Sequence, residues 1–323
     1  MARAWLVFYS EGACSVSQMQ IGIFGGEAGQ GAGGIDELIK AVHETADQGF
    51  GSYWLPQIFG LDALTALAVV GHNVPGIELG TSVIPTYPRH PLMLASQALT
   101  VQSAIGDRLS LGIGLSHQFV IEQMWGYSFD KPVRHMREYL TILRALLDER
   151  TVQFKGETLS ASGALTVAPE VPAPPVLVAA LGSQMLRLTG RMADGTITWM
   201  TGPATLAEHT VPTLKSATAE AGRPDAFRVV AGLPVCVTDD ADGARERAAQ
   251  VFAIYGQLPS YRAMLDREGA AGPADVALVG DEKTVQADIE RIAEAGATDF
   301  LAAEFGSSDA ERSRTRELLR SLL

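Results

Sequence analysis

The chain has 323 residues, 47% of them hydrophobic, which is enough for one large domain with a substantial buried core. Its 25 Lys and Arg stand against 37 Asp and Glu, a net charge of −12, which argues against a nucleic-acid partner because phosphate binding depends on clustered cations. Two distant cysteines, Cys14 and Cys236, and the lack of an apolar run of roughly 20 residues predict a cytoplasmic protein without disulfide framework, metal site or membrane segment.

The first half of the chain alternates short apolar runs with longer amphipathic segments. We interpret residues 1–18 as an N-terminal extension and expect a single domain over 19–323. Strands are expected at 19–24, 52–56, 77–84 and 108–114, and helices at 35–48, from Leu61, from Pro91 and at 132–147. The segment 151–175 breaks this rhythm with turn residues and prolines, so we expect a small insertion after strand four.

The same alternation resumes in the second half. Strands are expected at 175–181, 195–200, 227–237 and 298–305, and helices at 183–192, 203–221, 241–256, 282–295 and from Asp309. A less regular segment reaches to about residue 280, before strand eight. Eight strands, each followed by a helix, predict an α/β fold of the (β/α)8 TIM barrel class.

A glycine-rich motif follows the first strand. Residues 29–34 (GQGAGG) match G-x-G-x-x-G between a strand and a helix. A dinucleotide site also needs an acidic residue at the end of the second strand, but that strand ends in Trp54, Leu55, Pro56 and Gln57. The motif therefore favours a loop at the barrel mouth over a Rossmann site.

Chemistry in an α/β barrel gathers at the C-terminal ends of the strands. His117 follows strand four at such an end; it can exchange a proton near neutral pH, or it merely caps its loop, and both interpretations stay open. Residues 179–184 lead from a strand into a helix N-terminus, where exposed amides suit a phosphate. Arg134, His135 and Arg137 are interpreted as a solvated helix face, and His209 is assigned no function.

Five segments carry a family resemblance. They are GTSVIPTYPRHP (80–91), RLSLGIGLSH (108–117), DKPVRHMREYL (130–140), AALGSQMLRLTGRMADGTITW (179–199) and ATDFLAA (297–303). Together they resemble the luciferase-like monooxygenase superfamily, in particular its coenzyme F420-dependent branch, which includes methylene-tetrahydromethanopterin reductase. The resemblance covers residues from Met19 to the C-terminus and implies a (β/α)8 barrel that holds a flavin or deazaflavin ring at its C-terminal mouth.

The resemblance also implies roles for individual residues. It places a bulge with a non-prolyl cis peptide at Ser82–Val83 behind the ring, and a phosphate-binding turn at 180–184. The expected cofactor-binding residues are Trp54, Gln57, Ser82, Val83, Pro85, Gly114, Ser116, Ala180, Leu181, Gly182, Ser183 and Gln184. His117 is the first candidate for a catalytic proton donor and Tyr87 the second.

The predominantly apolar residues Phe24, Phe59, Trp125 and Trp199, with parts of 250–275, are expected to bind a small organic substrate with few charges. The sugar-phosphate dehydrogenases of the family place an Asp-His pair where this chain has Gln57 and Ile58, which argues against glucose 6-phosphate as substrate.

Three functions stay open at this point. The first is a coenzyme F420-dependent reductase or dehydrogenase that transfers a hydride between the deazaflavin C5 and a carbon or imine centre. The second is an FMN-dependent monooxygenase on the same barrel, and the third is a catalytically silent barrel that binds a ligand or partner. The resemblance further implies a homodimer formed through helices of the first half of the chain.

Overall fold

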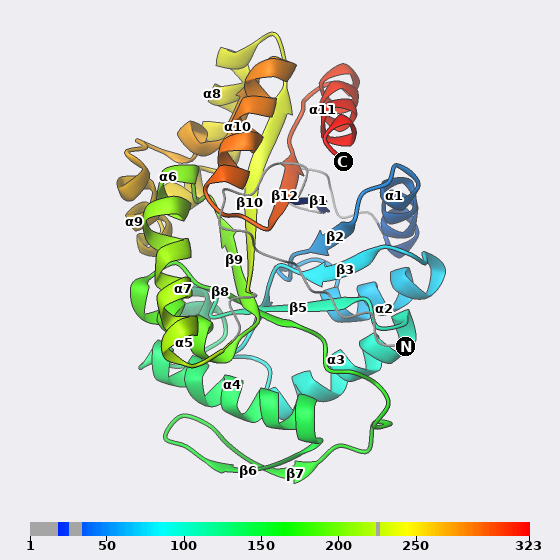
Figure 1. The fold of residues 1–323 in the computed structure, drawn as a ribbon, viewed down its shortest axis with the longest axis vertical. Coiled ribbons are helices and arrows are strands. Elements are labelled where there is room, and N and C mark those ends of the chain that lie inside the picture. Colours follow the sequence, from blue (N-terminus) through cyan, green and yellow to red (C-terminus); the bar gives the residue numbers. More distant parts are fainter. Residues whose placement is uncertain (1–18, 26–33, 224–226) are drawn as a thin grey trace.

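Eight parallel strands form a closed barrel, which the computed structural model describes over residues 19–25, 34–223 and 227–323 (Figure 1). The expected extension at 1–18, with Cys14, and residues 29–33 of the glycine motif lie outside the described residues. The barrel strands are β1 (Gln20–Phe24), β2 (Ser52–Leu55), β3 (Glu78–Thr81), β5 (Leu109–Gly114), β8 (Val176–Ala179), β9 (Gly195–Trp199), β10 (Arg228–Val237) and β12 (Asp299–Glu304). Pairing of β1 with β12 and of β9 with β10 closes the circle, so the predicted TIM barrel is confirmed.

Helices follow the barrel strands and surround them (Figure 1). They are α1 (Ile35–Asp47), α2 (Ala63–Asn73), α3 (Pro91–Ile105), α4 (Pro132–Glu149), α5 (Ser183–Met192), α6 (Pro203–Thr205), α7 (Val211–Glu220), α8 (Ala241–Val251), α10 (Glu282–Glu294) and α11 (Asp309–Ser321). Several begin at a residue whose side chain accepts a hydrogen bond from the first turn, as Asp62 does from the Thr65 amide. A π-helical turn at Leu206–Thr210 joins α6 to α7, within the helix predicted at 203–221.

Two segments depart from the barrel repeat. The predicted insertion after strand four is an antiparallel hairpin, β6 (Thr151–Lys155) and β7 (Ser160–Ala164), which packs outside α4 at the bottom of Figure 1. The segment before strand eight is more regular than predicted. It contains α9 (Pro259–Glu268) and a short strand, β11 (Leu278–Gly280), which pairs with β10. Helix α8 also ends at Val251 instead of 256, because a 3-10 turn occupies Ala253–Gly256.

Glu138 of α4 holds the turn of the β6–β7 hairpin. Its carboxylate accepts hydrogen bonds from the amides of Glu157 (3.0 Å), Thr158 (2.7 Å) and Leu159 (2.9 Å), and from the Thr158 hydroxyl (2.7 Å). Burial alone would raise the pKa of Glu138, but these hydrogen bonds outweigh it and lower the pKa to about 2. The carboxylate therefore fixes the hairpin to the barrel as a buried anion.

Strand three carries a bulge. Gly80 pairs with Ser110 and Ile84 with Ile113, so four residues of strand three oppose three of β5. The strand resumes as β4 (Ile84–Pro85), and the Ser82–Val83 peptide between the two pieces is cis, which confirms the location that the resemblance implied. Thr81 bridges the gap, since its hydroxyl accepts from the Gly112 amide (2.9 Å) and donates to the Gly112 carbonyl (2.8 Å).

Side chains alternate between the barrel interior and the layer under the helices. The interior cluster contains Phe24, Trp54, Leu177, Ile197, Val230, Leu301 and Ala303, with Val83 and Trp199 packed against it. Trp54 is its largest fully buried member, and Gly80 makes room for it, because a Cβ there would lie 2.1 Å from the indole ring. The interior is therefore a packed core and not a pore.

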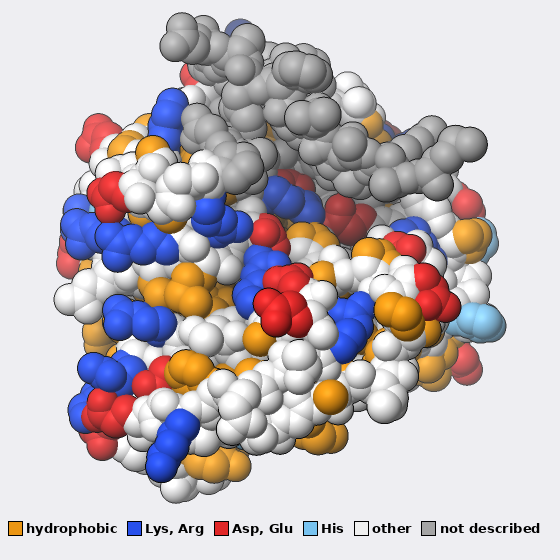
Figure 2. Space-filling model, turned by 60° about the horizontal axis from the view of Figure 1, so that its bottom comes forward, with side chains coloured by type: hydrophobic (Ala, Val, Ile, Leu, Met, Phe, Trp, Pro, Cys, Tyr) orange, Lys and Arg blue, Asp and Glu red, His pale blue; other side chains and the backbone are white. Residues whose placement is uncertain are grey.

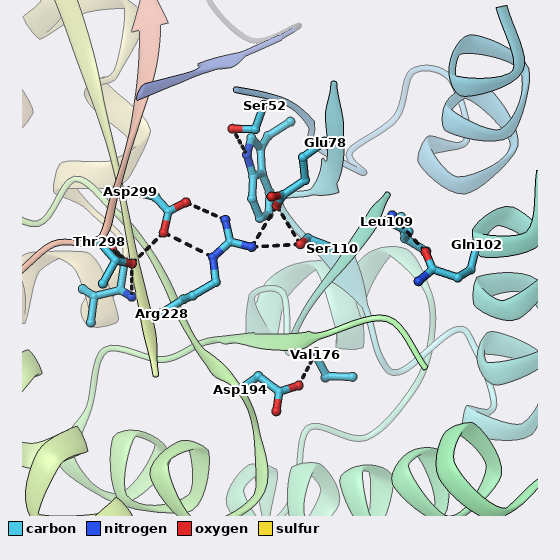
Figure 3. Close-up of polar contacts among 12 residues, drawn as sticks. Ser52, Glu78, Gln102, Leu109, Ser110, Val176, Asp194, Arg228, Thr298 and Asp299 are labelled. Atoms are coloured by element: carbon cyan, nitrogen blue, oxygen red, sulfur yellow. Dashed lines mark hydrogen bonds and ion pairs between the residues drawn. The ribbon is translucent and has the colours of Figure 1, made fainter. Parts of the chain in front are cut away.

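Arg228 closes the N-terminal end of the barrel (Figure 3). Its guanidinium donates to Asp299 (2.5 and 3.2 Å), to Glu78 (2.8 Å) and to the Ser110 hydroxyl (3.0 Å), and it lies 5.6 Å from the centre of the Trp54 ring. Burial alone would lower the pKa of Arg228, but Asp299 and Glu78 outweigh it and raise the pKa. We call Arg228, Asp299, Glu78 and Ser110 the bottom network.

On the face shown in Figure 2, basic and acidic side chains are intermixed and hydrophobic side chains form small scattered groups. Within the part of the chain that the structure describes, no helix has the length and apolar character needed to cross a bilayer.

Candidate active site

The bulge in strand three places Val83 at the C-terminal end of the barrel. Val83 is half-buried, packs on the interior cluster, and lies across Gly114 of β5. A Cβ on Gly114 would lie 2.6 Å from Val83 Cγ2 and 3.2 Å from the Ala179 Cβ, so any side chain there would displace Val83. Pro85, the next residue on the same side, is buried and pairs with Gly114. Val83 and Gly114 thus form a close-packed apolar surface, which we call the platform and against which a planar ring could pack.

The turn between β8 and α5 presents a helix N-terminus. Gly182 is the N-cap residue of α5 and supplies no side-chain cap, while Ser183 and Gln184 begin the helix. Ala180 is buried beneath the turn, and the Leu181 carbonyl accepts a hydrogen bond from Nε2 of His209 (2.8 Å). The first amides of α5 are therefore free of a local cap, and the positive end of the helix dipole suits an anionic group.

His209 was assigned no function from the sequence, but the structure gives it a supporting role. It is buried within the π-helical turn between α6 and α7. Because a carbonyl oxygen is an acceptor only, Nε2 of His209 carries the hydrogen and holds the Leu181 carbonyl in place. No local signal in the sequence pairs these two residues, which lie 28 positions apart.

A row of aromatic side chains lies along the C-terminal ends of the strands. The Phe24 ring stacks on Trp199 with centroids 5.2 Å apart, Trp199 meets Tyr255 edge-on at 5.8 Å, and Tyr255 meets Tyr261 at 5.1 Å. Tyr261 in turn lies 5.7 Å from His117. We call these five residues the aromatic row. Its buried Trp199 Nε1 is one of the few polar side-chain atoms of the described residues that lack a hydrogen-bond partner.

His117 ends the aromatic row beside Ser116. Ser116 has a positive φ of 63°, so the chain turns sharply after β5 and brings the imidazole back toward α9. Burial lowers the pKa of His117 below its usual value, so the ring is neutral at pH 7. A neutral imidazole can accept a proton or donate its one N–H in a hydrogen bond, but it is not a cationic acid.

Tyr87 lies in a separate aromatic stack. Its ring is parallel to that of His135 at 4.1 Å and lies 5.4 Å from Phe129, and its buried hydroxyl has no hydrogen-bond partner. Burial, followed by the carboxylates of Asp130 and Glu122, raises the pKa of Tyr87 to about 12, so the phenol stays protonated. The structure does not bring Tyr87 into the aromatic row.

The expectation of a solvated face at the start of α4 is wrong for His135. The residue is 6% exposed, and its Nε2 lies 3.0 Å from the Thr86 hydroxyl. Burial lowers the pKa of His135 to about 4. The rings of Tyr87 and Tyr139 both pack against His135, and the sequence spacing gave no sign of the contact with Tyr87.

Four other predicted site residues lie apart from the platform. Trp54 is fully buried below it, with its indole N–H donating to the Ser52 hydroxyl (2.9 Å). Gln57 accepts a hydrogen bond from the Ala63 amide (2.7 Å) and so caps α2. Phe59 is 64% exposed, and Trp125 is half-buried after a π-helical turn in the loop that follows β5.

The described residues also line a cavity of about 420 Å³ between α1 and α11. Tyr53, Glu304 and Arg316 lie in its wall, and Arg316 pairs with Glu304 through two hydrogen bonds, one of them 2.9 Å long. Phe24 is the one residue that this cavity shares with the aromatic row. The platform, the α5 turn and the aromatic row fit a planar ring with a phosphate better than this charged cavity does.

The arrangement is that of a barrel enzyme whose reacting groups meet at the C-terminal mouth. The sequence profile of the luciferase-like monooxygenase family matches residues 19–317. A 5,10-methylenetetrahydromethanopterin reductase of Archaeoglobus fulgidus is 30% identical over 243 residues, which are 74% of this chain and 71% of the relative. The chain therefore belongs to the luciferase-like monooxygenase family, and it is an enzyme.

Solved structures support the same fold. An F420-dependent secondary alcohol dehydrogenase in complex with an F420-acetone adduct superposes with a TM-score of 0.80 at 19% identity, covering 95% of this chain and 98% of that chain. The oxygenating constituent of 3,6-diketocamphane monooxygenase from Pseudomonas putida, in complex with FMN, gives a TM-score of 0.74 at 18% identity, covering 94% of this chain and 96% of that chain. At sequence identities this low, the similarity to these two structures shows a shared fold and nothing more.

Proposed function

We propose that this enzyme is a coenzyme F420-dependent oxidoreductase that transfers a hydride between the deazaflavin C5 and a small, mainly apolar organic substrate. The observation that carries the proposal is the platform of Val83 over Gly114, which faces the barrel mouth and leaves no room for a side chain behind it. A relative of Mycobacterium tuberculosis, 36% identical over 126 residues that are 39% of this chain and 35% of the relative, is named a putative coenzyme F420-dependent oxidoreductase, and this supports the choice of F420 over FMN.

Each part of the site has a role in this proposal. Val83, with Gly114, Ser82 and Pro85 behind it, supports the ring, and the amides of Ser183 and Gln184 bind the phosphate with the turn fixed by His209. When bound, the deazaflavin supplies a carrier that accepts or gives up a hydride. His117, neutral at pH 7, accepts a proton from the substrate or holds its polar group by a hydrogen bond.

The substrate lies between the cofactor and the aromatic row in this proposal. Phe24 and Trp199 form its apolar wall, and Phe59 and Trp125 come from the loops after β2 and β5. Among the five residues of the row none carries a full charge at pH 7, since His117 is neutral. An uncharged organic molecule fits this lining best. Tyr87 stays the second candidate, as a hydrogen-bond donor, because its hydroxyl has no partner and, with a pKa raised to about 12, keeps its proton.

The alternative is an FMN-dependent monooxygenase, which the description of the family itself favours. The test is the fate of the reduced cofactor under oxygen, measured with an oxygen electrode on protein loaded with either cofactor. Under the main proposal, the F420-loaded enzyme passes hydride to an acceptor without consuming oxygen. Substrate-dependent oxygen uptake by the FMN-loaded enzyme, with no turnover by the F420-loaded enzyme, would establish the alternative.

Location and assembly form a separate part of the proposal. We propose a cytoplasmic homodimer that binds neither nucleic acid nor membranes, consistent with the acidic composition and the sparse use of cysteine. Val69 of α2 and Met93 of α3 expose apolar side chains on first-half helices, where a second copy could cover them.

A further inference from the structure

Helix α9 connects two functional parts of the barrel mouth. It belongs to the segment between β10 and β11, carries Tyr261 in its first turn and ends with Glu268, beyond which Gly269 terminates it with a φ of 74°. Tyr261 belongs to the aromatic row. The position of α9 therefore determines the position of the Tyr261 ring within the aromatic row.

The carboxylate of Glu268 caps a different helix, α6. Its two oxygens accept hydrogen bonds from the amides of Ala204 (3.1 Å) and Thr205 (2.7 Å), and the Thr205 hydroxyl donates to the Met264 carbonyl of α9 (3.3 Å). An anion at this position accepts hydrogen bonds from the helix N-terminal amides that lack intrahelical partners, and it interacts favourably with the helix dipole. A residue 64 positions away in the sequence thus replaces the local cap of α6.

The N-cap residue of α6, Gly202, is shaped for this contact. It has no side chain with which to cap the helix, and a Cβ built on it would lie 2.3 Å from Cδ of Glu268 and 2.5 Å from Oε1. Only glycine lets the carboxylate approach the amides of Ala204 and Thr205 so closely. The contact therefore depends both on the carboxylate of Glu268 and on the absence of a side chain at Gly202.

The Glu268 contact fixes two members of the aromatic row, Trp199 and Tyr261, relative to each other. Trp199 ends β9 three residues before Gly202, and the Trp199 carbonyl accepts a hydrogen bond from the Thr201 hydroxyl (3.3 Å). Through this short turn, Glu268 connects the strand that carries Trp199 to the helix that carries Tyr261. The contact acts at a distance from the platform of Val83 and touches none of its residues.

We propose that Glu268 is a positioning residue that determines substrate specificity, by holding α9 so that the aromatic row forms a preformed wall for a flat, uncharged substrate. The inference rests on the proposed function for the identity of the reaction, but it concerns the substrate side of the site alone. A preformed wall binds a flat ligand without the entropic cost of ordering α9, so a loosened α9 weakens binding of the ligand and leaves the cofactor side unchanged.

The experiment uses Nile red, a flat, uncharged fluorophore, as the probe of the row, and coenzyme F420 as the probe of the platform. Both are titrated into the full-length wild type, Glu268→Gln, Glu268→Asp and Gly202→Ala. Glu294→Gln is the matched control, because Glu294 is also the last residue of a helix, α10, and is exposed. Gly202→Ala disrupts the same contact while Glu268 is retained. If one of the two variants fails to fold, the other still tests the contact.

We expect Glu268→Gln and Gly202→Ala to bind Nile red about tenfold more weakly than the wild type. The affinity of Glu268→Asp should lie between that of the wild type and that of Glu268→Gln, and the affinity of Glu294→Gln should equal that of the wild type. The dissociation constant for F420 stays within about twofold in every variant, which a general loss of structure would not allow. Equal Nile red affinity in wild type and Glu268→Gln, or no saturable Nile red binding by the wild type, overturns the inference. Failure of the wild type to bind F420, with the Nile red pattern intact, contradicts the proposed function instead.

Discussion

The polar groups inside the two ends of the barrel differ in how they are partnered. At the N-terminal end, the guanidinium of Arg228 is matched by Asp299, Glu78 and Ser110 (Figure 3). At the C-terminal end, the buried Trp199 Nε1 has no partner, and Ser116 adopts a positive φ. Removal of one partner from a matched buried ion pair is costly, because the other charge is left buried without compensation. An unpartnered buried group or a positive φ beside a candidate site is instead consistent with a role in binding. We therefore expect substitutions in the bottom network to affect stability and substitutions at the mouth to affect binding.

Substitution of Arg228 is expected to have the largest effect on the folded state. Arg228→Met leaves Asp299, which is 2% exposed, as a buried charge without its partner, and we expect a loss of about 3–5 kcal/mol in the free energy of unfolding. Urea denaturation measures it. The control is Arg187→Met, since Arg187 is exposed on α5. If the two variants lose the same stability, the bottom network is not what stabilises the barrel.

Glu138→Gln is expected to cost about 2–3 kcal/mol, because the carboxylate accepts four hydrogen bonds. The folded-state pKa of Glu138, about 2, lies below the usual 4.5, so its stabilising contribution is present above pH 4.5 and is lost as pH falls toward 2. Urea midpoints measured across this pH range should converge for wild type and variant at the acid end. Glu149→Gln, at the exposed end of the same helix, should show no such convergence.

Gly114→Ala tests the C-terminal end of the barrel, and the property expected to change is cofactor binding, not stability. The added methyl group displaces Val83 from the platform, and we expect F420 to bind about tenfold more weakly. Fluorescence titration measures this effect. Gly51→Ala is the control, because a Cβ there meets only the Gln20 side chain at 3.8 Å. Unchanged F420 binding in Gly114→Ala would remove Val83 from the cofactor site.

The smallest expected effect comes from Trp199→Phe. The substitution removes an unpartnered buried N–H group and keeps an aromatic ring against Phe24, so the free energy of unfolding should change by about 1 kcal/mol or less. Thermal denaturation of wild type and variant provides the comparison. A loss well above that value would mean that the indole N–H has a stabilising partner, and the contrast between the two ends of the barrel would weaken.

The sequence predicted what depends on local pattern. Helix α5 begins at Ser183 and ends at Met192, as its period indicated, and β9 begins at Gly195, where the strand at 195–200 was predicted to begin. The cis peptide at Ser82–Val83 followed from the family resemblance alone. Local periodicity and turn chemistry act within a few residues, so these features could be predicted.

The features that the sequence missed depend on contacts between distant segments. Glu268 caps α6 across 64 residues of sequence, and the Tyr87 ring stacks on His135 of the next βα unit. The segment that contains α9 is predicted to be less regular; the structure shows that the helix buries only Met264 and Leu265, so little apolar period marks it. Only the folded barrel brings these residues together.

The most direct test of the central claim is a fluorescence titration of the purified apoprotein with coenzyme F420 and, separately, with FMN at matched concentrations. The account predicts saturable, tight binding of F420 and weak binding of FMN, with the F420 affinity reduced in Gly114→Ala. Tight FMN binding with weak F420 binding would contradict it and establish the oxygen-using monooxygenase as the better description of this barrel.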